Sequence, residues 1–440
     1  MLTPIFCRSG VTHRGITHVN DTLHPNSPTF QPQYWGHALA TDFQPIVAVA
    51  HMRAVGAEAL LRPSDTVGAS VPPLELFAKA ALRQESQILD RLAQETHFSN
   101  FTEYSSENRW LFLNCHPDTL ILGSNDHSIL ESVVERHGLN PSHVVIEVLE
   151  HAAFSNEAII AAITTHQKRG FLIAIDDFGT GWSNLDRVWG VHPDFVKLDR
   201  SIVRRAALSR HDRRVTKMLI SMLHQMGVMV IAEGVETSEE ALTVMDADVD
   251  FLQGFHFGRP SRDLRRAGQF AEECVRKLWP QLSDLVIRVG VREHAQITVV
   301  RSMLRSAARE LQVTGSFDTA AKRFFTAPNT LSCLLLDIHG VQVGACIERL
   351  AIDNSFRSRT SPLFPSAGAN WSRRPYYKDA VKRPGHPSVH GPHCSLTNGG
   401  FVYTTAMTVE TDRGAFVLCG NFRLEQQELR VNCSSPNAMS

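Results

Sequence analysis

The sequence lacks the features of a membrane or secreted protein. It contains no run of 18 apolar residues, so we expect no membrane-spanning helix. The N-terminal segment MLTPIFCRSGVTHRG lacks the apolar stretch that a secretory signal peptide contains. The eight cysteines form no C-x-x-C pair and are scattered along the chain, which favours free thiols in a reducing compartment over a disulfide framework. We therefore expect a cytoplasmic protein.

An excess of charge of either sign is also missing. Lys and Arg number 44 against 45 Asp and Glu, so the formal net charge is −1. No overall field attracts a nucleic acid polymer or anionic lipid, and any phosphate ligand must be held by local groups. At 440 residues the chain is long enough for two or three domains. Residues 1–35 show no periodicity, and we expect a loosely ordered lead-in there.

From Phe43 onward, short apolar runs recur, and each ends in a polar residue followed by helix-like sequence. Units of roughly 30 residues that alternate strand and helix are typical of parallel α/β architecture. Counting a first strand near Gln44, about eight units favour a (β/α)8 TIM-like barrel over residues 36–262. An open doubly wound sheet is not excluded by the pattern alone. The polar strand ends are Glu58, Asn114, Glu147, Asp176, Lys197, Glu233 and Gln253.

The stretch Phe171–Leu185, FLIAIDDFGTGWSNL, joins an apolar run to two adjacent carboxylates, Asp176 and Asp177, and a Gly-Thr-Gly turn. The apolar run predicts a buried strand. Acids placed where such a strand meets a Gly-rich loop usually serve function rather than stability. A helix-capping aspartate in an ordinary turn would account for one acid but not for both.

Because the C-terminal ends of barrel strands meet at one face, these polar side chains are expected to share a pocket. The pocket would hold six carboxylates, two amides and one ammonium group, from Glu58, Asn114, Glu147, Asp176, Asp177, Lys197, Asp199, Glu233 and Gln253. Carboxylates at that density repel one another and require a cation. Hard oxygen ligands favour Mg²⁺, Mn²⁺ or Ca²⁺ over a softer metal. The residues thus predict metal binding, but not which bond is hydrolysed.

Together these residues resemble the EAL-domain family of cyclic di-GMP phosphodiesterases. The name-giving triplet is Glu58-Ala59-Leu60, and the family's strand-one QPIV matches Gln44–Val47. The family's strand-ending asparagine and its ExxE, DDFGTG, KxD, AEGVE and QG signatures match, in order, Phe112–Asn114, Glu147–Glu150, Asp176–Gly181, Lys197–Asp199, Ala232–Glu236 and Gln253–Gly254. The resemblance spans residues 40–262. It implies hydrolysis of cyclic di-GMP to linear pGpG with two divalent cations, Mg²⁺ or Mn²⁺, and inhibition by Ca²⁺.

The resemblance also implies a role for each matching residue. The implied ligands of the first metal are Glu58, Asn114, Glu147, Asp176 and Glu233. Asp177 and Asp199 would bind the second metal, with Asp176 bridging the two. Lys197 would orient or activate the attacking water in a catalytic centre that includes Glu58 and Glu233. The implied substrate-binding and supporting residues are Gln44, Arg62, Gln253 and Glu236.

The loop from Phe178 to Ser183 resembles the family's substrate- and dimer-coupled loop, so a homodimer is implied as well. Its implied controlling residues are Phe178, Gly179, Thr180 and Gly181, with Glu150 as their anchor. Where the family commonly has Thr, this chain has Leu149, which removes a possible hydroxyl contact. Relatives that have lost metal ligands act as non-catalytic cyclic di-GMP receptors through a protein partner. That role is the alternative, although none of the implied ligands is missing here.

Residues 263–312 predict linker helices, one ending at Pro280 and another over Glu293–Leu311. Strand patterns follow at 331–338, 341–347, 401–409 and 415–422. The sequence RPYYKDA between them resembles a ligand-pocket motif of Cache/PAS-like sensory domains. We therefore expect a smaller α+β Cache/PAS-like domain over residues 313–430 that regulates the barrel. The resemblance implies a small carboxylate or amine ligand, of unknown identity, at Arg374, Tyr376, Tyr377 and Asp379.

One further cluster has the composition of a metal site. His386, His390 and His393, with Cys394, form an H-x3-H-x2-H-C pattern whose side chains could bind Zn²⁺ or Cu²⁺. The pattern lies in a Pro- and Gly-rich segment rather than on one helix face, so we expect a solvated loop there. The sequence does not decide between the two.

Overall fold

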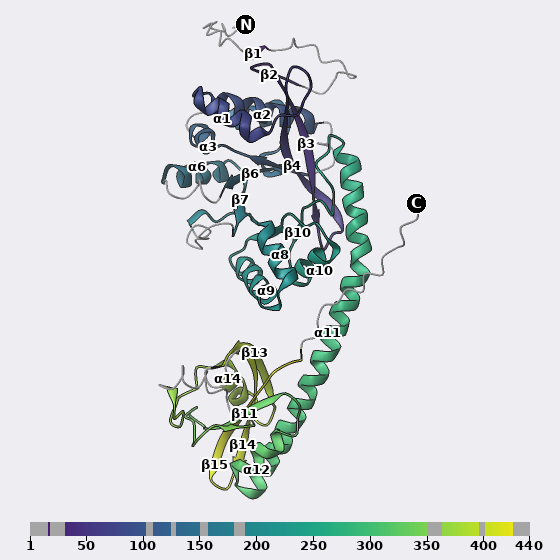
Figure 1. Ribbon diagram of the computed structural model, residues 1–440. Coiled ribbons are helices and arrows are strands. Elements are labelled where there is room, and N and C mark those ends of the chain that lie inside the picture. Colours follow the sequence, from purple (N-terminus) through teal and green to yellow (C-terminus); the bar gives the residue numbers. More distant parts are fainter. Residues whose placement is uncertain are drawn as a thin grey trace, which may run out of the picture. The chain divides into compact units, whose positions relative to one another are not determined.

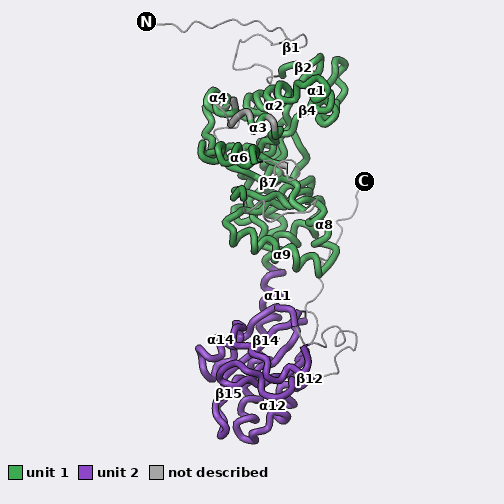
Figure 2. The backbone as a smooth tube through the Cα atoms, turned by 90° about the vertical axis from the view of Figure 1, so that its left-hand side faces the viewer, with its two compact units in different colours: residues 1–283 green, residues 284–440 purple. Residues whose placement is uncertain are grey.

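The structure is a computed structural model that describes residues 16–17, 31–102, 109–124, 129–149, 157–179, 190–349, 363–395 and 401–425. The chain forms two compact units, residues 1–283 and 284–440 (Figure 2). Helix α11 (Leu264–Thr314) contributes to both, so the border between the units lies inside the segment where we expected linker helices. None of the described helices combines the length and apolarity that crossing a membrane requires.

The first unit contains a closed eight-stranded barrel, as expected (Figure 1). Strands β3 and β4 stand at the two ends of the series of eight strands, and they also pair with each other. This pairing closes the barrel and excludes an open sheet. Two short strands, β1 (Ile16–Thr17) and β2 (Gln33–Tyr34), extend the sheet beyond β3. In pairing order the barrel strands are β3 (His37–Ala48), β10 (Phe251–Leu252), β9 (Met229–Ala232), β8 (Phe195–Leu198), β7 (Leu172–Phe178), β6 (Val144–Leu149), β5 (Trp110–Asn114) and β4 (Arg53–Ser64).

One barrel strand runs opposite to the expected direction. The strands from β4 to β10 are parallel to their neighbours, but β3 is antiparallel to both β4 and β10. The link from Ala48 to Arg53 is too short for a parallel crossover, which needs a dozen or more residues. Gln44 on β3 lies directly opposite Glu58 on β4, so it reaches the same level of the barrel despite the reversed direction.

Helices cover the outside of the barrel (Figure 1). Phe98 and Phe101 of α2 and Ile163 of α6 pack in one buried cluster with outward-facing strand residues such as Leu111 and Ile173. This cluster packs the helices against the outer surface of the barrel and so holds the strands in place. The described helices of this unit are α1 (Pro73–Leu82), α2 (Ser86–Phe101), α3 (Pro117–Ser124), α4 (Ile129–Arg136), η2 (Pro141–His143), α6 (Glu157–Lys168), α8 (Arg200–Leu208), α9 (Arg210–Gln225) and α10 (Ser238–Asp246).

The barrel interior is built in two layers. Residues two apart on a strand point to the same face, so each strand places successive inward residues one above the other. The lower layer is an apolar cluster that contains Ile46, Phe112, Val145, Ala174, Phe195, Ile231 and Phe251. A polar residue lies two positions from each of these residues and from Gly56 on β4, on the same side of its strand. These polar residues are Gln44, Asn114, Glu147, Asp176, Lys197, Glu233, Gln253 and Glu58. The apolar layer thus closes the barrel beneath one polar layer.

The second unit is built around a five-stranded antiparallel sheet (Figure 1). Helix α11 and helix α12 (Phe317–Phe324) pack on one face of the sheet through Leu304, Phe324 and Leu335. Helix α14 (Pro375–Lys382) packs on the other face, where Tyr376 meets Leu336. A second, smaller sheet domain is therefore present. Its strands, in pairing order, are β12 (Ile347–Glu348), β11 (Thr330–Asp337), β15 (Gly414–Phe422), β14 (Phe401–Thr411) and β13 (Ser388–Cys394).

Three local expectations for this half of the chain were wrong. The strand expected over 341–347 is absent except at its end, where β12 begins at Ile347. Helix α11 does not end at Pro280 but runs through it. Proline removes a helix hydrogen bond, yet Val275, Leu278 and Leu282 on either side are buried, so tertiary packing overrides the local preference. The histidine and cysteine cluster is not a loop, because residues 388–394 form β13 with an irregular register between His390 and His393.

The apolar layer supports a prediction about stability. Phe195 is fully buried, and its ring centroid lies 5.3 Å from those of Trp110 and Phe112 and 5.8 Å from that of Phe251. Replacing it by alanine opens a cavity and should lower the free energy of unfolding by about 3–5 kcal/mol. Urea unfolding followed by circular dichroism measures the loss. Phe195→Leu fills most of the space and should lose less than half as much; equal losses would contradict the cavity explanation.

Candidate functional site

Lys197 stands at the centre of the polar layer and is 1% exposed. Its Nζ lies 2.5 Å from Glu147 Oε1, 2.6 Å from Glu233 Oε1, 3.1 Å from Asp176 Oδ1 and 3.3 Å from Glu58 Oε2. The four carboxylates come from β4, β6, β7 and the end of β9, so the barrel geometry brings together residues far apart in sequence. Because four carboxyl groups surround one ammonium group, the charge of the cluster is not balanced, and it can accept further positive charge.

Burial and charge together set the ionisation of this cluster. Burial acts to lower the pKa of Lys197, but the surrounding carboxylates hold that pKa well above its usual value. Burial and the neighbouring Glu58 raise the pKa of Glu147 well above its usual value, and burial together with Asp176 and Glu58 raises the pKa of Glu233 to about 8. Burial acts in the same direction on Glu58, but Lys197 lowers the pKa of that carboxyl below its usual value. Near neutral pH Lys197 therefore stays an ammonium ion.

A strand irregularity places Asp177 beside Asp176. In a regular strand adjacent side chains point to opposite faces. Here β7 pairs with β8 through Ile175–Val196 and next through Phe178–Leu198, so both aspartates stand opposite Lys197. Asp177 has a φ of +57°, a left-handed conformation that Asp tolerates better than most residues. As a result, carboxylate oxygens of Asp176, Asp177 and Glu233 lie within 4.8 Å of one another.

Amide side chains fix the orientation of Glu58. Asn114 Nδ2 donates to Glu58 Oε1 at 2.9 Å, and Gln253 Nε2 donates to Glu58 Oε2 at 2.7 Å. Gln253 Nε2 also lies 3.3 Å from Gln44 Oε1, and Gln44 Nε2 donates to the carbonyl oxygen of Gly258 at 3.2 Å. Because each link is a directed hydrogen bond, the Glu58 carboxylate is held in one position before any ligand binds.

The polar layer fits divalent cations. Glu147 Oε1 and Asp176 Oδ1 are buried and contact Lys197 Nζ, whereas the buried Oε2 of Glu147 accepts no hydrogen bond from the described residues. A buried acceptor without a donor is costly unless a cation or water completes it. Carboxylate oxygens of Asp176, Asp177 and Glu233 form a second, compact group of possible ligands in the same layer. A donor set made only of oxygens suits Mg²⁺, Mn²⁺ or Ca²⁺, in agreement with the expectation from the sequence.

Three of the expected site residues have partners at the edge of this cluster. Asp199 is half-buried and caps α8 by accepting from Ser201 N at 2.8 Å. Arg62 Nε pairs with Asp42 Oδ2 at 3.1 Å. Glu236, expected to support the metal ligands, forms an ion pair with Arg200. Neither partner was expected from the sequence, because Asp42 lies inside β3 and Arg200, the first residue of α8, is a cation just beyond the acidic end of β8.

Only part of the expected control loop lies within the described residues. Phe178 is 3% exposed. Gly179 has a φ of +102°, and a Cβ there would lie 2.3 Å from Ile202 Cδ1, so the backbone passes closely over α8 and requires glycine. Glu150, Thr180 and Gly181, which were expected to control the loop, lie outside the described residues.

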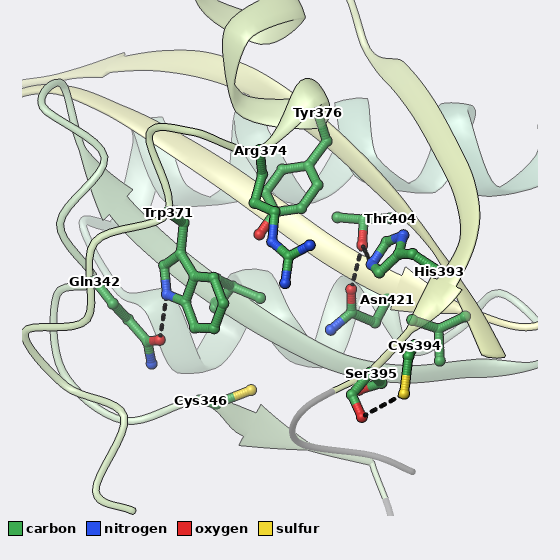
Figure 3. A pocket seen from close by; sticks show the side chains of 12 residues that line it. Gln342, Cys346, Trp371, Arg374, Tyr376, His393, Cys394, Ser395, Thr404 and Asn421 are labelled. Atoms are coloured by element: carbon green, nitrogen blue, oxygen red, sulfur yellow. Dashed lines mark hydrogen bonds between the residues drawn. The ribbon is translucent and has the colours of Figure 1, made fainter. Parts of the chain in front are cut away.

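The four residues expected to hold a ligand in the second unit separate into two pairs. Arg374 and Tyr376 line a cavity (Figure 3). Tyr377 instead donates its hydroxyl to the carbonyl oxygen of Ile338, and Asp379 forms an ion pair with His390, 2.9 Å between Oδ2 and Nε2. Residues missed from the sequence also line the cavity, including His393, Thr404 and Asn421, because they become neighbours only through the pairing of β13, β14 and β15.

The charge cluster predicts how stability depends on Lys197. Lys197→Met removes the one ammonium group that, among the described residues, contacts the four acids, and it should cost about 3–5 kcal/mol near pH 8 in EDTA. The raised pKa values of Glu147 and Glu233 mean that protonation relieves this loss, so the loss should shrink as the pH falls. Urea unfolding at several pH values measures it. Lys79→Met, in an exposed pair with Glu75, should have little effect. A loss that does not change with pH would contradict the charge explanation.

Comparison with known proteins agrees with the residue pattern. A protein-family model described as the EAL domain matches residues 36–260, just over half of the chain. The probable cyclic di-GMP phosphodiesterase PdeB of Escherichia coli is 26% identical over 231 residues, which are 52% of this chain and 44% of PdeB. The probable cyclic di-GMP phosphodiesterase PdeA of the same organism is 33% identical over 149 residues, 34% of this chain and 20% of PdeA. The matches thus span less than half of either relative.

A solved structure resembles most of the fold. The Bacillus subtilis YkuI protein, solved with its EAL domain in complex with substrate c-di-GMP and calcium, matches with a TM-score of 0.73. The match covers 88% of this chain and 97% of that one at 18% sequence identity, and at this identity it establishes the fold alone. The barrel, the ordered signatures and the family model agree. The chain belongs to the EAL-domain family.

Proposed function

We propose that this protein is a metal-dependent phosphodiesterase that hydrolyses cyclic di-GMP to linear pGpG. The observation that carries the proposal is the set of four carboxylates in contact with Lys197 Nζ, one of which, Glu147, has a buried Oε2 that accepts no hydrogen bond from the described residues. The proposal is supported by two relatives named probable cyclic di-GMP phosphodiesterases and by YkuI, which was solved with c-di-GMP and calcium.

Two divalent cations, Mg²⁺ or Mn²⁺, are proposed as cofactors, with Ca²⁺ as an inhibitor. Glu58, Asn114, Glu147, Asp176 and Glu233 would hold one cation, and Asp177 and Asp199 would hold the other together with Asp176. When bound, such cations lower the pKa of a coordinated water and neutralise charge on the phosphate. The charge count is consistent with this, because four carboxylates contact one ammonium group.

Lys197 acts through its fixed positive charge. Without bound cations the surrounding carboxylates hold its pKa well above the usual value, so its Nζ carries a positive charge. It can donate hydrogen bonds to an attacking water or to a phosphate oxygen, and it balances part of the charge of the acids. Gln253 and Asn114 keep Glu58 aligned. Arg62, half-buried beside Asp42, is proposed to contact a substrate phosphate.

The second unit is proposed to regulate hydrolysis, and the chain is proposed to form a homodimer. The regulatory role is supported by the continuity of α11, which contributes to the cores of both units without a break. The dimer is supported by apolar residues of α11 that face solvent, among them Val286, Ile287 and Val291, which are 52%, 61% and 66% exposed.

Removal of one ligand tests the reaction. Glu58→Gln keeps the shape of the side chain but removes a charge, and the rate of pGpG formation should fall at least a thousandfold, about 4 kcal/mol in the activation free energy. The measurement is nucleotide chromatography after incubation with cyclic di-GMP and Mg²⁺, and again in EDTA, where no pGpG should form. Glu75→Gln on the surface of α1 is the control. A wild-type protein that binds cyclic di-GMP and makes no pGpG with Mg²⁺ or Mn²⁺ would instead indicate a receptor.

The role proposed for Asp177 is testable with a matched control. Asp177→Asn removes the charge but keeps a residue that tolerates positive φ. The Mg²⁺ concentration that gives half-maximal hydrolysis should rise at least tenfold, because a cation loses a charged ligand. Asp248 also has a positive φ, +73°, and its side chain is 89% exposed, so Asp248→Asn should leave the Mg²⁺ dependence unchanged. Equal behaviour of the two variants would remove Asp177 from the metal site.

A further inference from the structure

Two charged residues lie on the barrel strands β3 and β4, beyond the polar layer and toward the open end of the barrel. Asp42 shares the inward side of β3 with Gln44, because residues two apart on a strand point the same way. Arg62 shares the inward side of β4 with Glu58 for the same reason. In the register of the two strands Gln44 lies opposite Glu58, so Asp42 and Arg62 are diagonal neighbours across the strand pair.

The Arg62 guanidinium is held at two of its nitrogens. Its Nε donates to Asp42 Oδ2 at 3.1 Å, and its Nη1 donates to the carbonyl oxygen of Leu61 at 3.0 Å. A guanidinium is planar, so these two bonds fix the directions of its remaining N–H groups. No described residue accepts a hydrogen bond from Nη2. The side chain of Arg62 is 33% exposed, so an acceptor from outside the chain can reach it.

Asp42 stands between two guanidinium groups. The N–H of Phe43 donates to the carbonyl oxygen of Ser261 at 2.8 Å, and the N–H of Ser261 donates back at 3.0 Å. This pairing brings Arg262 to β3, where its Nε lies 3.9 Å from Asp42 Oδ1, the carboxylate oxygen that Arg62 does not use. The ionised side chains of Asp42, Arg62 and Arg262 together carry one net positive charge, which attracts a phosphate group.

The position of Arg62 suits a contact that is the same in the bound substrate and in the transition state. Arg62 follows Glu58 by four residues, roughly 13 Å along the strand at ~3.3 Å per residue. It therefore lies near the mouth of the barrel and not among the acids that contact Lys197. An interaction that is equally strong in both states lowers KM and leaves kcat unchanged. A residue that orients Arg62 should affect KM in the same way.

We propose that Asp42 is a positioning residue for recognition of the substrate. It holds the Arg62 guanidinium so that the N–H groups not used within the chain can donate to a phosphate of the cyclic dinucleotide. Without this anchor the long side chain of Arg62 would have to be ordered when the substrate binds, at a cost in side-chain entropy. The inference rests on the proposed function, because the substrate and the phosphate contact of Arg62 are those proposed above.

Steady-state kinetics with cyclic di-GMP and Mg²⁺ tests the role of Asp42. Asp42→Ala removes the acceptor, so KM should rise at least fivefold while kcat changes less than twofold. Asp42→Asn keeps an oxygen acceptor at the same reach and should raise KM less than Asp42→Ala does. Glu131→Ala is the matched control. Glu131 Oε1 lies 2.9 Å from Arg169 Nε in a pair whose side chains are 25% and 24% exposed, outside the polar layer, and its loss should leave KM unchanged.

A double variant separates positioning from a general effect on structure or charge. In Arg62→Ala, the further change Asp42→Ala should leave KM as it is, because the guanidinium that Asp42 orients is gone. Equal factors in both backgrounds, an unchanged or lower KM in Asp42→Ala, or an equal rise in Glu131→Ala would overturn the inference. Thermal unfolding establishes that each variant is folded. If Asp42→Ala is not folded, Asp42→Ser takes its place, because its hydroxyl is one atom short of the carboxylate oxygens.

Failure of the inference and failure of the proposed function give different results. Calorimetric titration with cyclic di-GMP in Ca²⁺, the proposed inhibitor, measures binding alone, and the dissociation constants should follow the same order of variants as KM. Wild-type protein that binds the nucleotide but forms no pGpG would reject the phosphodiesterase, and these dissociation constants would then decide the role of Asp42. Wild-type hydrolysis with an unchanged KM in Asp42→Ala would reject only that role. Wild-type protein that neither binds nor hydrolyses would reject both.

Discussion

One ammonium group among four carboxylates is the interaction on which the barrel's polar layer depends. Each of the four acids lies within 3.3 Å of Lys197 Nζ, and the group is almost fully removed from water. An isolated charge in such a place would be very costly, and pairing is what makes it tolerable. The pairing is incomplete, since one positive charge cannot balance four acids. Protons on acids such as Glu233 relieve part of the remaining negative charge, and bound cations would relieve it as well, so the stability of the cluster and its capacity to hold cations have one origin.

The two-residue period of the strands makes this arrangement possible. Every barrel strand that carries a polar inward residue carries a small or apolar inward residue two positions away, as Phe195 precedes Lys197. The apolar layer keeps water from reaching the charges from below, which strengthens every electrostatic interaction above it. It also means that the site cannot be altered independently of the core, because a change in the ring packing around Phe195 moves the strand that holds Lys197.

The barrel and most of its polar layer could be predicted from the sequence because strand ends are visible as apolar runs that stop at a polar residue. What could not be predicted depends on pairing. The antiparallel direction of β3 follows from a short hairpin link, and the shared side of Asp176 and Asp177 follows from a register shift against Lys197. The partner Asp42 lies inside β3 rather than at a strand end, and the pairing of Arg200 with Glu236 joins segments that follow two different strands. In the second unit the motif located Arg374, but only the ion pair to His390 reveals that Asp379 is directed elsewhere.

The two units use charge in opposite ways. The barrel concentrates four carboxyl groups around the one ammonium group of Lys197, so its polar layer favours ligands that carry positive charge. The cavity of the second unit is lined by Arg374 and by no described acidic residue, so it does not favour them. Because the two sites differ in the sign of the charge that they present, a cation suited to the first is not drawn to the second.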